Sequence, residues 1–237
     1  MGHPTRRSVL GMIAGTGAAA AFDLRWLVAH AQGIAEGQSP YFFLSTNEAA
    51  VLTALVDRII PRDDWPSASE AGVIDYIDLQ LATAWGEGAR LYRDGPFHEG
   101  KEAQGYQLPY TPAELYRKAL AGIIDTDASQ FLNLSDEDKD ALLTRLDKGE
   151  TELNGVPGKA FFSMLRQNTI EGYFADPAYN GNRDYAGWNM VGFPGADAYY
   201  LTEIDRYNMV YWRAPSGIAH RPNIGTQRFT AQQAAGG

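Results

Sequence analysis

The stretch from Ser45 to Pro61, STNEAAVLTALVDRIIP, decides the fold of this chain. Ser45 followed three residues later by Glu48 is a capping box, in which each side chain bonds the backbone N–H of the other residue. Apolar residues then recur at helical spacing, at Val51, Leu52, Leu55, Val56 and Ile59. Pro61 ends the segment, because proline has no backbone N–H to donate. The pattern predicts an amphipathic helix from Ser45 to Ile60 that buries one face. Asp57 and Arg58 point away from that face and are expected to form a solvated or interfacial pair.

Four further segments carry similar signals. One follows the Pro/Ser-rich turn at residues 61–69, and its apolar positions are Val73, Ile74, Ile77, Leu81 and Trp85. Thr111, Pro112 and Glu114 supply an N-cap, a first-turn proline and a third-position glutamate for the next helix. Another begins at Ser135. The last begins near Pro157 and carries Phe161, Phe162, Leu165 and Ile170 toward Tyr173. With no convincing strand alternation, about five main helices predict a single all-α domain.

Two long segments lack a sustained period. Residues 86–109 are rich in glycine, charge and aromatic side chains, and we interpret them as a surface excursion. Residues 177–195 combine glycine, asparagine and aromatic side chains, and a loop of this length without regular structure is uncommon unless it binds something. One interpretation is a self-packed loop whose rings, those of Tyr179, Tyr185, Trp188 and Phe193, cover the end of the core. The other is a docking surface that includes Arg183, and a loop that packs at its base and presents its tip satisfies both.

The first residues of the chain resemble an export signal. Arg6 and Arg7 precede an apolar run from Val9 to Phe22, and the small residues at Ala29-His30-Ala31 favour cleavage before Gln32. A twin-arginine leader of this kind directs an already folded protein to the periplasm. The rival interpretation is a dinucleotide-binding turn at Gly15–Ala20, but no second β-branched strand follows it. The run is also short and interrupted by glycine, so we expect no membrane span after processing.

Composition restricts the possible functions. The chain of 237 residues has a net charge of −9, which disfavours binding to nucleic acid or anionic lipid. It has no cysteine, so disulfides, iron–sulfur ligation and c-type haem attachment are excluded. After removal of the leader only His98 and His220 remain, which is too few for a multi-histidine metal site. Asp75 and Asp78 could share a helix face, but spacing alone does not make an acid/base pair. An independent periplasmic carbohydrate-binding protein or hydrolase remains the alternative function.

Several segments resemble the gluconate 2-dehydrogenase subunit 3 family. They are residues 55–66, LVDRIIPRDDWP; residues 71–78, AGVIDYID; residues 169–177, TIEGYFADP; and residues 187–195, GWNMVGFPG. The resemblance implies a noncatalytic small subunit of a periplasmic dehydrogenase that oxidises a sugar, sugar acid or polyol. It places FAD on a glucose–methanol–choline type flavoprotein large subunit, with haem on a cytochrome c subunit in some complexes. It also implies that this chain supplies the export signal for the flavoprotein and stabilises it, and it carries over no catalytic residue.

These considerations define three regions and one interface. We expect a signal peptide at residues 1–31, a helical accessory domain at residues 32–213 and an extended polar tail at residues 214–237. Arg6 and Arg7 are assigned to export. The predicted partner contacts are Tyr173, Phe174, Tyr179, Asn180, Arg183, Trp188, Asn189, Phe193 and Pro194. On this assignment, Trp188→Ala should weaken the complex more than it destabilises the free subunit.

Overall fold

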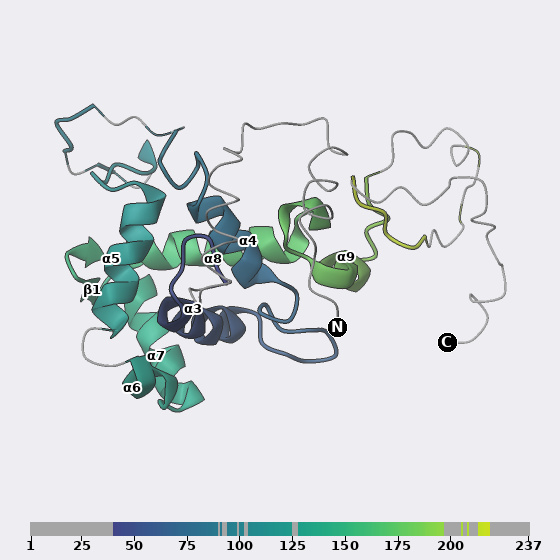
Figure 1. Ribbon diagram of the computed structural model, residues 1–237, viewed down its shortest axis with the longest axis horizontal. Helices are drawn as coiled ribbons and strands as arrows, with labels where there is room; N and C mark the ends of the chain where they lie inside the picture. The colour runs from purple at the N-terminus through teal and green to yellow at the C-terminus, as the bar shows by residue number, and fades with distance from the viewer. Residues whose placement is uncertain are drawn as a thin grey trace. The chain divides into compact units, whose positions relative to one another are not determined.

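The structure is a computed structural model that describes residues 40–89, 91, 94–98, 100–101, 104–124, 128–196, 205, 208 and 213–218. The chain divides into two units, Met1–Pro40 and Tyr41–Gly237, and all the elements described here belong to the second. They are α3 (Thr46–Ile59), α4 (Val73–Leu81), α5 (Pro112–Ile124), α6 (Ala128–Leu132), α7 (Asp136–Asp147), β1 (Glu152–Leu153), β2 (Val156–Pro157), α8 (Gly158–Phe174), the 3-10 turns η2 (Pro177–Tyr179) and η3 (Arg183–Tyr185), and α9 (Ala186–Val191) (Figure 1). Within the described residues the only sheet is the small hairpin β1–β2, so the all-α prediction is confirmed.

Helix α3 forms the centre of this unit, as its sequence predicts. Both bonds of the capping box are present, with the Ser45 N–H 2.9 Å from a Glu48 carboxylate oxygen. Four of the five predicted apolar side chains are fully buried, and Ile59 is half-buried. Helix α3 packs against α4, α5, α6, α7 and α8. Each large aliphatic side chain buried in this way contributes about 1.5–3 kcal/mol to folding, so the helix is held by its neighbours more than by its own propensity.

Helix α8 is the second organising element and packs against α3, α4, α5, α7 and α9. Its most buried row is Phe161, Leu165, Thr169 and Tyr173, four residues apart. Ile170 lies off this row and is 46% exposed. Gly172 allows close approach to α4, because a Cβ atom there would lie 2.9 Å from the Tyr76 ring.

A buried carboxylate fixes the first described segment of the domain. Asp78 is only 2% exposed and accepts hydrogen bonds from the backbone N–H groups of Phe42, Phe43 and Leu44, at 2.7, 2.9 and 2.8 Å. From the other side, Arg117 donates to the Phe43 carbonyl and lies over the Phe43 ring. Asp78 therefore has a structural role, because its carboxylate is occupied by backbone donors.

Glu48 links this segment to α5 and makes the fold sensitive to acid. Its carboxylate accepts hydrogen bonds from Ser45 and pairs with Arg117. Burial opposes the charged form, but the bonds from Ser45 and Arg117 outweigh it and hold the pKa of Glu48 below its ordinary value of 4.5. The folded-state pKa is depressed, so the stabilisation is complete above the unfolded-state pKa and is lost as the pH falls through the folded-state pKa.

The variant Arg117→Met is therefore expected to lose less stability than the wild type when the pH is lowered. Thermal melts from about pH 6 to about pH 3 would measure this, because removing the guanidinium brings the pKa of Glu48 closer to its unfolded value. Arg62→Met is the matched control, since Arg62 pairs with Glu70 at an exposed site where ion pairs contribute little. Identical pH profiles for the Arg117 variant and the wild type would contradict the assignment.

Candidate partner interface

The segment at residues 177–195 is ordered by regular structure, so the prediction of a loop without regular structure is wrong. It contains η2, η3 and α9. Asp176 caps η2 by accepting from the Ala178 N–H at 2.9 Å. Positive φ angles at Asn180, Asn182, Asp184 and Tyr185 then reverse the chain between these short elements. Asparagine and aspartate tolerate this conformation better than most residues do, which explains the composition that suggested a loop.

Asn182 is the residue that fixes this segment, and the sequence analysis did not select it. It is fully buried, its N–H donates to the Gly172 carbonyl at 2.8 Å and its amide donates to the Ala175 carbonyl at 2.8 Å. Its amide oxygen accepts from the Gly187 N–H at 2.8 Å. The one available signal was the sequence Asn-Gly-Asn-Arg at residues 180–183, in which Asn182 is the third residue. Asparagine and glycine favour left-handed backbone.

Two predicted contact residues are inside the domain. Trp188 is 6% exposed, stacks on Tyr185 at 5.5 Å, meets the edge of Phe193 at 5.0 Å, and donates its indole N–H to the Phe174 carbonyl at 2.8 Å. Tyr173 has no exposed surface, and its hydroxyl donates to the Pro66 carbonyl at 2.8 Å. Both side chains are enclosed by the domain in this conformation, which for Trp188 is what the self-packing interpretation describes.

The other predicted contacts lie at the surface. Tyr179, Asn180, Arg183, Asn189 and Phe193 are exposed, while Phe174 and Pro194 are half-buried. Arg183 forms an ion pair with Asp75 at 2.7 Å, which ties η3 to α4. Their role in binding a partner stays a prediction.

Exposed apolar side chains are concentrated between residues 170 and 218 of the described chain. Nine large hydrophobic side chains are exposed, and six of them are Ile170, Tyr179, Met190, Val191, Phe193 and Ile218. The other three, Trp65, Phe97 and Leu134, belong to separate segments. Single exposed apolar residues are ordinary, whereas a gathering of them marks an interaction site. We call Met190, Val191, Phe193 and Ile218 the α9 surface.

The start of the predicted tail returns to this surface. Ser216 pairs with Gly195 in a parallel bridge, in which the Ala196 N–H donates to the Ser216 carbonyl at 2.8 Å. The Gly217 N–H donates to the Tyr185 hydroxyl at 3.1 Å, and the Ile218 N–H donates to Asp176 at 2.6 Å. Residues 213–218 are therefore attached to the domain. Residues 219–237, and residues 197–212 apart from 205 and 208, lie outside the described residues, as do Arg6, Arg7 and His220.

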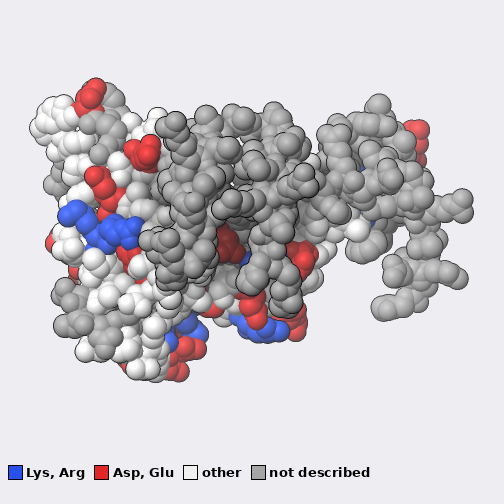
Figure 2. All heavy atoms as spheres, in the orientation of Figure 1, with Lys and Arg blue, Asp and Glu red and all other residues white. Residues whose placement is uncertain are grey.

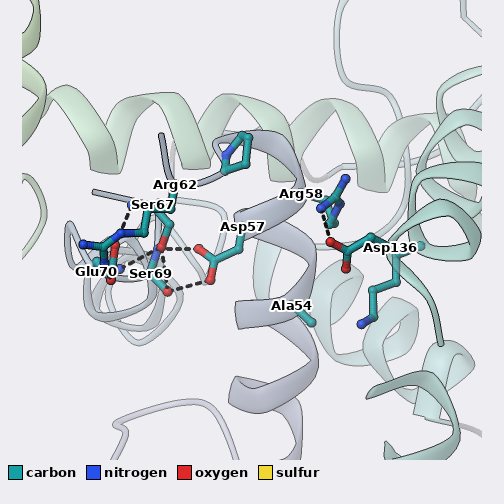
Figure 3. A pocket seen from close by; sticks show the side chains of 10 residues that line it. Ala54, Asp57, Arg58, Arg62, Ser67, Ser69, Glu70 and Asp136 are labelled. Atoms are coloured by element: carbon teal, nitrogen blue, oxygen red, sulfur yellow. Dashed lines mark hydrogen bonds and ion pairs between the residues drawn. The ribbon is translucent and has the colours of Figure 1, made fainter. Parts of the chain in front are cut away.

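A second feature is an open groove of about 440 Å³ between α3, the segment at residues 61–70 and the start of α7 (Figure 3). Asp57 and Arg58 point to opposite sides of α3, so the expectation that they pair with each other is wrong. Asp57 accepts from the backbone and hydroxyl of Ser69 at 2.8 and 2.7 Å. Arg58 donates to Asp136 and to Asp140, and this guanidinium holds the pKa of Asp140 below its ordinary value.

Polar side chains in the groove therefore connect α3 to the segment at residues 61–70 and to the start of α7. Arg62 and Glu70 pair with each other, and the Lys139 ammonium donates to the Leu132 carbonyl at 3.2 Å. The charged side chains of its described lining are thus engaged within the chain. Its lining contains no histidine, and the Ser69 hydroxyl there donates to the Asp57 carboxylate.

Potential metal ligands and basic side chains are the next features of the described residues. No three His, Cys, Asp or Glu side chains among the described residues come close enough together to hold a metal ion. On the face drawn in Figure 2, the described basic side chains lie beside acidic ones and form no continuous positive patch. None of the described helices is both long and apolar enough to cross a bilayer.

Comparison with known proteins identifies the family of this chain. The family model for gluconate 2-dehydrogenase subunit 3 matches residues 46–195, from the start of α3 to the bridge at Gly195. A search of curated proteins and a search of solved structures each gave no match. The matched region covers most of the chain and includes every described helix. The chain belongs to the gluconate 2-dehydrogenase subunit 3 family.

Proposed function

We propose that this chain is the noncatalytic small subunit of a periplasmic, FAD-dependent sugar, sugar-acid or polyol dehydrogenase. The family match over residues 46–195 carries the proposal, because the family is named for one subunit of a dehydrogenase complex. Its task is to bind and stabilise a flavoprotein large subunit of the glucose–methanol–choline type. The α9 surface supports this role, since exposed apolar side chains gather there next to a rigid base.

The redox groups are proposed to lie on other subunits. FAD and the sugar would bind the flavoprotein, and haem would belong to a cytochrome c subunit. The absence of cysteine supports this division, because c-type haem and iron–sulfur clusters need thiols. The described groove also supports it, because its acids and bases are committed to ion pairs and backbone groups.

Export is the second proposed task. Arg6 and Arg7 would direct the folded chain through the twin-arginine pathway, and a flavoprotein bound to it would cross with it. A cofactor such as FAD is inserted before export, which requires a route for folded proteins. The complex is therefore proposed to act in the periplasm.

Affinity purification of the tagged full-length chain from the periplasm of its native cell tests the proposal. We expect a larger protein to co-elute in near-stoichiometric amount, with the absorbance of a flavin and with activity on a sugar or polyol. Mass spectrometry of the eluate identifies the partner. A colourless chain that elutes alone, and that binds carbohydrate by itself, would instead support an independent binding protein or hydrolase.

A further inference from the structure

We infer that the docking surface of this subunit is composite, with Ile218 of the returning segment at residues 213–218 completing the surface begun by Met190, Val191 and Phe193. This inference rests on the proposed function, because the occupant is the flavoprotein subunit. The family match ends at residue 195 and therefore omits the part that completes the surface.

The returning segment fits a site that is shaped for it. Gly195 has φ +94°, and a Cβ atom there would lie 2.2 Å from the Ser216 carbonyl oxygen. A Cβ atom at Gly217 would lie 2.9 Å from the Asp176 carboxylate. Both glycines thus permit backbone contacts that any side chain would block. Asp176 serves both ends of the site, because one oxygen caps η2 and the other accepts from Ile218.

Tyr185 has a strained backbone that the returning segment helps to hold. Its φ of 57° lies in the left-handed region, which is unfavourable for a residue other than glycine. In this conformation the ring stacks on Trp188 while the hydroxyl accepts from the Gly217 N–H. Tyr185 is thus a positioning residue that joins the aromatic base to residues 216–218.

The segment presents an apolar side chain at the edge of an apolar surface. Ile218 and Val191 are each 60% exposed, and Phe193 is 43% exposed. The backbone N–H of Ile218 donates to Asp176, and Ile218 lies two residues after the bridge at Ser216. Both contacts hold the backbone from which the Ile218 side chain projects. Rigid exposed apolar groups bind well, because little side-chain or loop freedom is lost on association.

Charge identifies the kind of partner. Asp184 is exposed beside α9 and has no ion pair with another described residue, and the full chain of 237 residues has a net charge of −9. An anionic lipid surface or a nucleic acid would be repelled. The complementary occupant is a protein surface with an apolar centre and lysine or arginine at the edge facing Asp184. Such edge charges act mainly on the rate of association.

Freeing the returning segment tests the composite surface. We expect Gly195→Ala, and separately the double variant Asp176→Asn with Tyr185→Phe, to bind the purified flavoprotein at least tenfold more weakly. Gly149→Ala is the matched control, because Gly149 also has a positive φ but is remote from this surface and meets only the Lys159 Cβ at 3.8 Å. Circular dichroism should show an unchanged helical signal in all of them, since α3 to α8 are untouched.

Substituting the exposed side chains separates contact from folding. Ile218→Asp and Val191→Asp should each weaken binding at least tenfold, whereas Leu134→Asp, the same kind of change at an exposed site between α6 and α7, should not. Asp184→Lys should slow association and reduce its dependence on salt. If Gly195→Ala and Ile218→Asp bind like the wild type, the composite surface is overturned while the accessory function stands. If the wild-type chain binds no flavoprotein, the proposed function fails and this inference fails with it.

Discussion

Replacing Arg6 and Arg7 by lysine is expected to leave both this chain and its flavoprotein partner in the cytoplasm. The periplasmic fraction of each should fall by at least about tenfold, because lysine keeps the charge but lacks the planar, multidentate guanidinium. Fractionation followed by immunoblotting of both subunits measures the effect. Flavin absorbance of the cytoplasmic complex should persist, since the two arginines belong to residues 1–40 and the domain begins at Tyr41.

The control substitution is Arg25→Lys, which changes the same residue type after the apolar run and should leave export intact. A flavoprotein that reaches the periplasm in normal amount alongside the Arg6→Lys, Arg7→Lys variant would show that it has its own route. Co-export would then be rejected, although the stabilising role could still be measured on the purified complex.

The helices were predictable where their signals are local. The capping boxes at Ser45 and Thr111 each involve a bond between residues three apart, and both form, with the Thr111 N–H 2.8 Å from Glu114. Ser135 likewise caps α7. Such bonds depend on the chain's nearest neighbours, so a sequence alone is enough to predict them. Helix α4 ends at Leu81, although the apolar spacing extended to Trp85. Its end was harder to predict than its beginning, because helix ends carry weaker sequence signals.

The short elements could not be predicted because they depend on tertiary contacts. Helix α6 has five residues and α9 has six, which is too few to establish a period of 3.6. The strands β1 and β2 contain two residues each. Helix α9 forms where it does because Asn182 bonds to α8 and to Gly187, and no local pattern encodes those bonds.

The candidate interface stays a prediction, and the sequence did not tell which of its side chains are buried. Aromatic and asparagine residues do gather at the exposed end of the domain, yet composition does not tell which rings face inward. Trp188 and Phe193 are five residues apart and in edge contact, but one is buried and the other is 43% exposed. The chain reverses direction at Gly192, whose φ is +68°. As a result Trp188 is packed inside the domain while Phe193 is partly exposed to solvent.

Trp188→Ala is therefore expected to destabilise the free subunit by about 3–5 kcal/mol, as for other buried aromatic truncations. This reverses the expectation from sequence, because the indole fills the space between Tyr185 and Phe193 and bonds the Phe174 carbonyl. For a domain of this size the loss corresponds to a fall in Tm of roughly 6–20 °C. Urea denaturation followed by circular dichroism measures it directly.

Two variants serve as comparisons for Trp188→Ala. Trp65→Ala removes a tryptophan that is 36% exposed and should cost less stability than Trp188→Ala, because more of its ring already faces solvent in the folded state. Phe193→Ala should cost less stability than Trp188→Ala while weakening flavoprotein binding more than it weakens the fold, since its ring is partly presented to solvent. If Trp188→Ala left the unfolding free energy unchanged and reduced only the affinity, the aromatic cluster would be part of the contact surface, and the division between a packed base and a binding edge would be wrong.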